Sequence, residues 1–316
     1  MRVITGDEAA RARFEKAVVT VGNFDGVHIG HAAILGTVVD RAGLLGAEAV
    51  ALTFDPHPRK VLQPEAAPAM LTSLEQKLEL FEAAGLDAVV VEPFTLEFSR
   101  TAPESFIRER LHEQLRPLEV YVGYDFHFGR DRLGSMRLLT EMGPLLGFAV
   151  TIIPEVRVAA GDVNSSRIRA CLAEGEIEAV SALLGRSYSV RGEVVVGDQR
   201  GREIGFPTAN LASENELLPA AGVYAGELLL LDSGPPETGV RLPVVTNVGR
   251  RPTFPEARGL LAEAHVIDWE GDLYGRRVEL SFRQRLRAER KFDGVDALRD
   301  QIARDVAAAR LLLGPA

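Results

Sequence analysis

The sequence AVVTVGNFDGVHIGH, residues 17–31, decides the fold of the N-terminal half of the chain. Its first five residues are apolar or β-branched, which predicts a short buried strand. Gly22, Gly26 and Gly30 then stand at steps of four, and residues 31–45 have the apolar spacing of a helix. A strand that leads through a glycine-rich turn into a helix is typical of the ligand edge of an open α/β sheet. The stretch therefore predicts a parallel α/β domain with a binding site at this turn.

The flanking segments repeat the alternation of strand and helix up to about the middle of the chain. Continuous runs of Val, Ile and Leu between amphipathic helices predict a parallel sheet that is covered on both faces. The further strand-like runs are 47–54, 87–91, 118–122 and 148–153, and the helical patterns are 31–45, 73–84, 103–114 and 135–146. Two more helices, at 165–173 and 177–184, are expected to follow the sheet.

The pattern changes after Tyr188. Short strand-like runs now follow one another through Gly- and Pro-containing turns, which predicts a closed antiparallel barrel or a sandwich. One helix with a single apolar face is expected at the C-terminus. We place the boundary at Gly185, which gives domains 1–185 and 186–316. The runs are 189–196, 223–231, 242–248, 261–268 and 277–282, and the helix face holds Val295, Leu298, Ile302, Val306, Ala309 and Leu313.

The 316 residues include 36 Lys and Arg, 45 Asp and Glu, and the single cysteine Cys171. This length is enough for two domains with separate cores. The net charge of −9 argues against nucleic-acid binding, which needs a basic surface. No apolar run approaches the ~20 residues of a membrane span, and the first residues lack the apolar core of a secretory signal. We therefore expect a cytoplasmic protein without nucleic-acid or membrane partners, and self-association is left open.

His28 and His31 stand at the predicted start of the first long helix. A helix N-terminus offers free N–H groups and a positive dipole end, and two imidazoles beside it can donate to charge on a phosphate. The same residues would also fit a tight turn with one surface and one buried histidine. The chain contains no G-x-G-x-x-G fingerprint and no Gly-Lys pair of a P-loop, and one cysteine is too few for an ordinary zinc site. Nucleotide phosphates are therefore the preferred ligand.

Three further motifs accompany this one, namely TFDPHP at 53–58, GYDFHFG at 123–129 and SSRIR at 165–169. Together with GNFDGVHIGH they resemble the nucleotidyltransferase signature of the bacterial bifunctional riboflavin kinase/FMN adenylyltransferase (FAD synthetase) family. The resemblance covers essentially the whole chain. It implies an α/β parallel-sheet nucleotidyltransferase (Rossmann-like) domain, followed by an antiparallel β-barrel domain with a C-terminal helix.

The resemblance also implies site residues in the first half. The family's histidine pair and Ser-Ser…Arg segment contact ATP phosphates, so His28 and His31 take the catalytic role here. The family usually reads Ser-Ser-Thr where this chain has Arg167, which replaces a hydroxyl by a positive charge. Taken without a ligand, the two serines would cap a helix. The nucleotide-binding residues implied in this half are Gly22, Phe24, Asp25, Gly30, Asp125, Ser165, Ser166 and Arg169.

Aromatic residues recur near the ends of the predicted strands. Phe54, Phe126 and Phe128 would each be interpreted as core residues when taken singly. The resemblance implies that some members of this group line a flavin pocket, where an aromatic ring stacks on the isoalloxazine.

The second half carries GDQRGREIGFPTAN at 197–210. Its amides and guanidinium groups can hold phosphates. Thr208 and Asn210 lie two apart, so their oxygens project to one face of an extended segment and can complete the ligand shell of Mg²⁺. Spacing alone favours the simpler interpretation, a long hairpin loop with ordinary turn residues.

GFPTAN resembles the riboflavin kinase signature. This resemblance favours a phosphate and metal site over an ordinary hairpin loop. It implies that Thr208 and Asn210 are nucleotide and metal residues, and that Glu263 is the catalytic base. Without it, Glu263 would be interpreted as a solvated residue on the outside of a barrel. Motifs at 217–224, 247–254 and 272–275 follow the family's order. The binding residues implied here are Gly197, Arg202, Gly205, Phe206, Thr208 and Asn210.

The implied activity has two steps, with ATP as co-substrate and Mg²⁺ as cofactor. Riboflavin is phosphorylated to FMN, and FMN is adenylylated to FAD with release of pyrophosphate. The alternatives are a class I aminoacyl-tRNA synthetase fragment, a single-activity nucleotidyltransferase, and a flavin-binding regulator with degenerate sites. The first lacks a Lys-Met-Ser-Lys-Ser-like segment, because the chain has only Lys16, Lys60, Lys77 and Lys291. The motif around Thr208 argues against the second, and retention of both histidines and Glu263 argues against the third.

Overall fold

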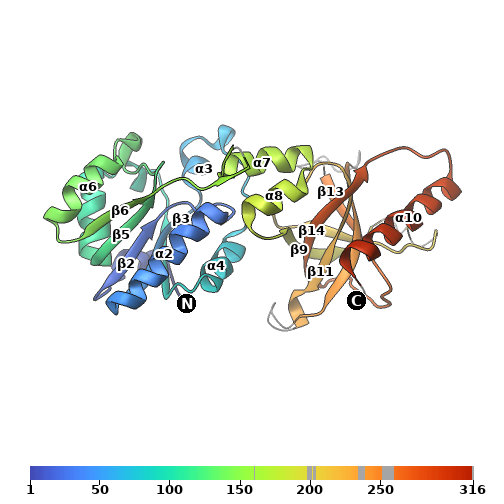
Figure 1. Cartoon of the computed structure of the whole chain (residues 1–316), viewed down its shortest axis with the longest axis horizontal. Coiled ribbons are helices and arrows are strands. Elements are labelled where there is room, and N and C mark those ends of the chain that lie inside the picture. The colour runs from blue at the N-terminus through green and yellow to red at the C-terminus, as the bar shows by residue number, and fades with distance from the viewer. Residues whose placement is uncertain (160, 198–200, 202–203, 234–238, 251–259, 315–316) are drawn as a thin grey trace. The chain divides into compact units, whose positions relative to one another are not determined.

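The computed structural model describes residues 1–159, 161–197, 201, 204–233, 239–250 and 260–314. The chain divides into two compact units, Met1–Asn164 and Ser165–Ala316. The first unit is built on an open sheet and the second on a closed barrel (Figure 1). The predicted order, an α/β parallel-sheet domain followed by an antiparallel barrel, is therefore confirmed.

The sheet of the first unit has six strands in the order β1-β4-β3-β2-β5-β6. Every neighbouring pair is parallel. The sequence analysis did not anticipate β1, a short edge strand whose residues are mostly exposed. The bounds are β1 Arg2–Thr5, β2 Ala17–Val21, β3 Glu48–Asp55, β4 Ala88–Pro93, β5 Pro117–Gly123 and β6 Ala149–Ile153.

Helices connect these strands and cover both faces of the sheet. The segment 103–114, expected as one α-helix, is a single α-helical turn that continues as a π-helix. The sequence analysis also missed two short helices, α1 and α3. The bounds are α1 Gly6–Arg11, α2 Ile29–Leu45, α3 Pro58–Leu62, α4 Leu74–Ala83, α5 Pro103–Ser105, the π-helix η3 Phe106–Leu115 and α6 Met136–Leu145. A small hairpin, β7 Arg157–Val158 and β8 Gly161–Asp162, follows the sheet.

Two apolar clusters lie on opposite faces of the central strands. One contains alternate residues of β2 and β3 together with the π-helix, among them Val19, Leu52 and Ile107. The other contains the intervening strand residues together with α2 and α4, among them Ala51 and Phe81. Burial on both faces explains why these strands are continuous apolar runs in the sequence.

The strand order reverses beside β2. The chain passes from β2 to β3 and β4 on one side, and returns to β5 on the other side of β2. In open α/β sheets, ligands bind outside the carboxyl ends of the strands at such a switch point. The loops that follow β2 and β5 are therefore the expected walls of a binding site.

The second unit is a closed barrel in the order β10-β13-β12-β11-β14-β9, closed by the pairing of β9 with β10. All neighbouring pairs are antiparallel. The rings of Tyr188 and Tyr224 both pack on Phe282, and all three are buried. The barrel alternative is confirmed over the sandwich, and the short strand β10 was not anticipated. The bounds are β9 Tyr188–Val195, β10 Ala209–Ser213, β11 Gly222–Leu230, β12 Arg241–Arg250, β13 Leu260–Val266 and β14 Arg277–Ala288.

One long helix, α10 (Val295–Leu313), packs on the outer surface of the barrel. Val306 and Ala309 are buried there against Val223 and Val245. The predicted apolar face is confirmed in its middle, whereas Val295 at the first position is 61% exposed.

Two helices precede the barrel and belong to the same compact unit, α7 (Ser165–Glu174) and α8 (Ile177–Leu184). The amide of Ala220 donates to the carbonyl of Leu172 at 2.9 Å, and Arg285 Nη1 donates to the carbonyl of Glu174 at 3.0 Å. The helix pair is thus bonded to the barrel. Whether the functional boundary lies at Gly185 is a separate question and stays a prediction.

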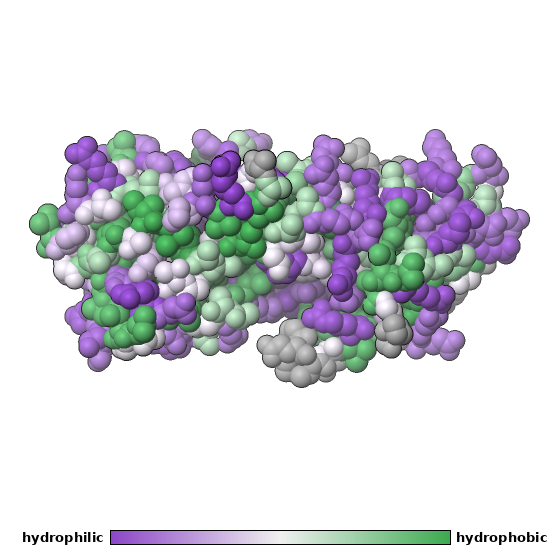
Figure 2. Space-filling view, in the orientation of Figure 1, coloured by the Kyte–Doolittle hydropathy of each residue, from purple (hydrophilic) through white to green (hydrophobic). Residues whose placement is uncertain are grey.

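Among the described residues, no helix is both long enough and apolar enough to cross a membrane. On the face drawn in Figure 2, hydrophilic residues are spread over both units. Most large apolar side chains lie instead in the clusters described above.

Candidate active sites

Three of the sequence motifs follow three adjacent strands of the first unit. GNFDGVHIGH follows β2, TFDPHP begins in β3, and GYDFHFG begins at the end of β5. Because β3, β2 and β5 are parallel neighbours, their carboxyl ends lie at one edge of the sheet. The fold thus brings the three motifs together at the switch point.

The turn between β2 and α2 has an unusual backbone. Phe24, Gly26 and Val27 have positive φ angles of 50°, 81° and 38°. A Cβ atom on Gly26 would lie 2.7 Å from Cδ1 of Leu71, so only glycine fits against this neighbour. The turn is therefore shaped by the residues packed behind it.

His28 and His31 form one structural unit at the start of α2. His28 is the N-cap, and its Nδ1 accepts a hydrogen bond from the amide of His31 at 3.3 Å. The two imidazole rings stack with centroids 3.6 Å apart and 16° between their planes. A Cβ on Gly30 would lie 3.1 Å from the His28 ring, which explains the glycine between them. Both predicted histidines thus lie at the helix N-terminus.

Residues 71–77 contact this turn from behind. Asp25 is buried, and its Oδ1 accepts from the amide of Leu71 at 2.9 Å, while the amide of Gly26 donates to Thr72 Oγ1 at 3.3 Å. Lys77 Nζ donates to the carbonyl of Asn23 at 2.9 Å. Burial lowers the pKa of Lys77, and the carboxylates of Asp25 and Asp55 oppose that shift. The sequence analysis missed this segment, because nothing local relates it to a motif some 50 residues upstream.

Phe24 and Asp125, both predicted to bind nucleotide, lie in different environments. Phe24 is 2% exposed, and its ring packs edge-to-face on Phe81 and His31. It can therefore shape the turn from inside. Asp125 is exposed in the loop after β5, and its backbone oxygen lies 2.9 Å from His127 Nδ1.

Six phenylalanines form a continuous aromatic cluster at this edge of the first unit. Neighbouring ring centroids are 5.3–6.5 Å apart. Phe106 and Phe128 are buried, and the other four are half-buried. Phe54, Phe126 and Phe128 are thus both core residues and neighbours of the edge. The cluster consists of Phe54, Phe94, Phe98, Phe106, Phe126 and Phe128.

The predicted phosphate residues Ser165, Ser166 and Arg169 lie on α7, in the second compact unit. Ser165 is the first residue of that helix, Ser166 is exposed, and Arg169 is half-buried.

In the barrel, the predicted catalytic and metal residues lie in one row across the strands. Asn210 on β10 is directly opposite Glu263 on β13, which is directly opposite Asn247 on β12. Opposed residues in antiparallel strands project to the same face. Val223, the next member of the row, packs in the core shared with α10. The row therefore faces outward, and α10 packs on the same outer surface over β11 and β12.

The segment before β10 is fixed against this row. A Cβ on Gly197 would lie 2.2 Å from Nδ2 of Asn210, and Asn210 itself is 5% exposed. Phe206 packs edge-to-face on His265, and His265 Nδ1 lies 2.8 Å from the carbonyl oxygen of Pro207. Gly205 adopts a positive φ of 88°. Arg202, predicted to bind phosphate, lies outside the described residues.

A magnesium ion would find oxygen ligands here. Within the described residues there is no cluster of three or more His, Cys, Asp or Glu side chains that could hold a metal. Mg²⁺ in phosphate-transfer sites needs only one or two protein oxygens, because waters and phosphates supply the rest. Thr208 precedes β10, and Asn210 faces Glu263. The hydroxyl of Thr208, the amide oxygen of Asn210 and the nearby carboxylate of Glu263 are therefore suitable ligands for Mg²⁺.

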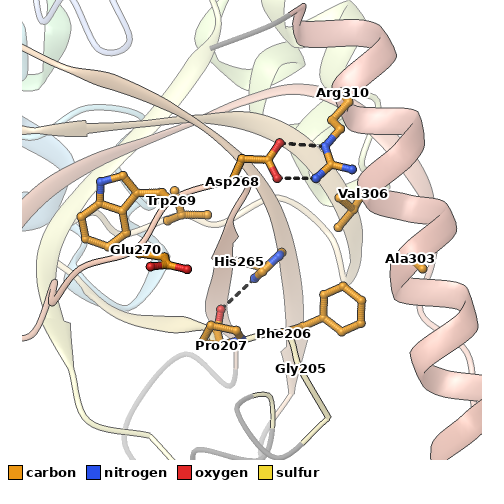
Figure 3. Close-up of a pocket in the computed structure, with 11 residues that line it drawn as sticks. Gly205, Phe206, Pro207, His265, Asp268, Trp269, Glu270, Ala303, Val306 and Arg310 are labelled. Carbon is orange, nitrogen blue, oxygen red and sulfur yellow. Dashed lines mark hydrogen bonds and ion pairs between the residues drawn. The ribbon is translucent and has the colours of Figure 1, made fainter.

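A pocket of about 730 Å³ opens beside this segment (Figure 3). Its walls come from residues 205–207, from the end of β13 and the loop after it, and from α10. Trp269 lines it, and Asp268 accepts from Arg310 Nε at 3.0 Å across its rim. This volume is typical of a pocket for a cofactor-sized ligand. The sequence analysis did not single out Trp269 or His265.

Two family models match the chain, one over each half. The model described as FAD synthetase matches residues 10–167, and the model described as riboflavin kinase matches residues 184–313. The first match contains the motifs of the first half up to Arg167, and the second match contains the motif at 197–210 and Glu263.

Curated relatives cover nearly the whole chain. A "bifunctional riboflavin kinase/FMN adenylyltransferase" from Escherichia coli K12 is 36% identical over 315 residues, 99% of this chain and 98% of its own length. Relatives with the same name from Pseudomonas fluorescens and Bacillus subtilis are 36% and 34% identical, covering 100% and 92% of this chain and 99% and 90% of their own lengths. A solved structure named as a macrolide-efflux protein from Streptococcus pneumoniae has a TM-score of 0.87 at 26% identity, covering 98% of this chain and 99% of its own.

Proposed function

The chain belongs to the bifunctional riboflavin kinase/FMN adenylyltransferase family, and from that membership we propose how its residues divide the two activities. The enzyme phosphorylates riboflavin with ATP to FMN, and it adenylylates FMN with a second ATP to FAD and pyrophosphate. One observation carries the assignment. Each half holds its own set of motif residues, the histidine pair at the sheet edge and the row of Asn210 and Glu263 on the barrel.

The adenylyltransferase step uses the first set. The phosphate of FMN attacks the α-phosphate of ATP, and the bond to the departing pyrophosphate breaks. The attacking phosphate is already ionised, so the step depends on positioning and on stabilisation of charge. His28 and His31, with the N-terminus of α2 beneath them, supply donors to that charge. Gly22, Gly30 and Asp125 border the nucleotide, and the backbone turn set by Phe24 and Asp25 holds it. Ser165, Ser166 and Arg169 contact ATP phosphates in the same reaction.

The aromatic cluster provides the flavin site of this step. Its half-buried members lie near the end of β3 and in the segments that follow β4 and β5. An isoalloxazine ring can stack on such faces without losing hydrogen bonds. We assign this role to the cluster as a group.

The kinase step uses the second set. Glu263 accepts the proton of the riboflavin 5′-hydroxyl, whose oxygen attacks the γ-phosphate of ATP, and ADP leaves. Asn210, directly opposite Glu263, and Thr208 would hold the phosphates and the metal ion. Mg²⁺, when bound, neutralises phosphate charge. Gly197, Arg202 and Gly205 complete the phosphate loop.

The pocket in Figure 3 is assigned to the adenine base of the kinase ATP. It adjoins Phe206 and Pro207, the residues that lead directly to Thr208. Trp269 offers a flat face, and Ala303 and Val306 offer apolar surface, as a purine needs. The phosphates would then extend toward Asn210.

Domains 1–185 and 186–316 are the functional division that goes with this assignment. Riboflavin, FMN and ATP are the small-molecule partners. The absence of nucleic-acid partners and a cytoplasmic location follow from composition alone and remain predictions.

The direct test is to incubate the purified chain with riboflavin, ATP and Mg²⁺, and to separate FMN and FAD by chromatography. We expect FMN first and FAD later, with both lost when EDTA removes the metal. A chain that makes FMN only would be a single-activity kinase. A chain that binds flavin but makes neither product would be a flavin-binding regulator.

A further inference from the structure

The turn that carries the histidine pair has a strained backbone conformation. Phe24 and Val27 have φ angles of 50° and 38°, in the left-handed region that L-residues avoid. Residues in this region are strained, and a β-branched valine is among the least suited to it. A turn of this kind persists only when its surroundings hold it in place.

A large part of those surroundings is one short segment, residues 71–77. Leu71 donates to the Asp25 side chain at 2.9 Å, Thr72 accepts from the Gly26 amide at 3.3 Å, and Lys77 donates to the Asn23 carbonyl at 2.9 Å. These contacts reach three of the four residues from 23 to 26. Residues 71–77 are thus hydrogen-bonded to the turn at several positions.

The start of α4, from which these contacts come, is itself held in place. Ser73 caps α4, and a capping box joins the side chains and amides of Ser73 and Gln76 at 3.0 and 3.2 Å. Gln76 is 5% exposed, and Phe81 anchors the helix in the core. Lys77 therefore extends from a fixed point.

Lys77 differs from an ordinary surface lysine. Such side chains keep their ammonium group in water. Here the ammonium donates instead to a backbone carbonyl, a charge-assisted bond that is stronger than a neutral one. The hydroxyl of Thr53 also points to the same carbonyl oxygen, at 3.4 Å, from the end of β3. The Asn23 carbonyl is thus the point where β3, α4 and the turn are joined.

The charges around Lys77 favour this position. The carboxylates of Asp25 and Asp55 attract the ammonium group, while the cation of Lys60 repels it. Asp25 is the same residue whose other contact fixes Leu71. The cation and the turn's own carboxylate therefore support each other.

We infer that Lys77 is a positioning residue of the adenylyltransferase site, which fixes the turn 22–28 through the Asn23 carbonyl so that His28 and His31 meet the reacting phosphates. The inference rests on the proposed function of the histidine pair. Lys77 acts through the backbone, so its loss should affect the transition state more than substrate binding.

The test replaces Lys77 by Met, which keeps the length of the side chain but removes charge and donor. We expect kcat for FAD formation from FMN and ATP to fall at least about 10-fold, with the KM values for FMN and ATP within about threefold of the parent. Lys77→Arg, which retains a cationic donor, should recover part of kcat. FMN formation by the same preparation should be unchanged, because the kinase residues lie in the other unit.

Lys16→Met is the matched control, because Lys16 is exposed before β2 and is a lysine of the same unit. It should leave both activities unchanged. Thermal unfolding of all variants is measured alongside.

Three results would overturn the inference. Lys77→Met could retain FAD synthesis within twofold of the parent. It could instead raise KM without lowering kcat. Finally, the loss of FAD synthesis in Lys77→Met could be accompanied by a matching fall in unfolding temperature that Lys77→Arg fails to restore. The first would make the contact dispensable, the second would make Lys77 a substrate ligand, and the third would make it a stabilising residue only. If the unmodified chain made no FAD, the proposed function itself would fail, which is a distinct outcome.

Discussion

His28 and His31 stack face to face, with ring centroids 3.6 Å apart, and the amide of His31 donates to the ring nitrogen of His28. The two rings are therefore not independent. The bond from His31 fixes Nδ1 of His28 as an acceptor, so in the neutral ring the Nε2 of His28 carries the proton. In this arrangement Nδ1 caps the helix and Nε2 is the donor atom of the His28 ring.

Replacing either histidine by alanine should lower FAD formation on the order of 10²–10³-fold, because one preorganised donor to transition-state charge is lost. FMN formation should stay nearly intact. Initial rates of both products, measured on the same sample, check this. An equal loss of both activities would point to misfolding or to a shared site.

Glu263→Gln should lower FMN production by about 10²–10⁴-fold, because the amide keeps the shape of the side chain but cannot accept the hydroxyl proton. FAD synthesis from added FMN should hardly change, and riboflavin affinity should be similar. Turnover is measured at saturating riboflavin and ATP. If most of the kinase turnover remained, Glu263 would be an ordinary outward-facing carboxylate of β13.

Two fragments should differ in stability but not in chemistry. Residues 165–316 and 186–316 should both phosphorylate riboflavin, and neither should make FAD. The shorter fragment loses α7 and α8, whose buried Leu172 and Leu184 belong to the same compact unit as the barrel, so it should unfold at least about 5 °C lower. Calorimetry and a kinase assay check this. A folded barrel fragment without kinase activity would contradict the functional division at Gly185.

Trp269, the single tryptophan of the chain, should report on the kinase pocket. Addition of ADP with Mg²⁺ should change its fluorescence, because the adenine base would stack within the pocket. The adenylyltransferase site has no tryptophan, so ADP bound there gives no such signal. If Glu263→Gln still shows the ADP response, binding is separated from catalysis. A response to riboflavin but none to ADP would assign the pocket to the flavin instead.

Arg110→Met should destabilise the first unit by about 3–5 kcal/mol, because it leaves a buried carboxylate without its partner. Arg110 pairs with Glu92 at 3.1 Å, and Glu92 is 4% exposed. Burial raises the pKa of Glu92, and Arg110 lowers it. A raised carboxyl pKa costs stability as the pH rises through it, so the deficit should be larger at pH 8 than at pH 5. Denaturant unfolding at both pH values checks this, with Glu92→Gln in the variant expected to restore part of the loss.

The sequence was sufficient for the two fold classes, because the apolar patterns record burial directly. β2 matched the predicted residues 17–21, since a strand buried on both faces is a continuous apolar run. β1 and β10 escaped prediction because they are short, and each pairs with at least one strand far away in the chain. The apolar pattern of residues 103–114 predicted a helix there, but it did not distinguish the π-helical turns after Pro103 from an α-helix.

The candidate site residues were named from local motifs, and local motifs carry residue type and spacing. Their assembly was decided by the tertiary structure. Only the strand order β3-β2-β5 places three motifs at one sheet edge, and only the register of β10 on β13 sets Asn210 opposite Glu263. Lys77 shows the limit most clearly. Its bond to Asn23 spans 54 residues, and an amine on an amphipathic helix looks the same in sequence whether it faces water or a backbone carbonyl. The sequence defines the residue types and their spacing. The packing of α4 on the sheet decides which of these residues are in contact.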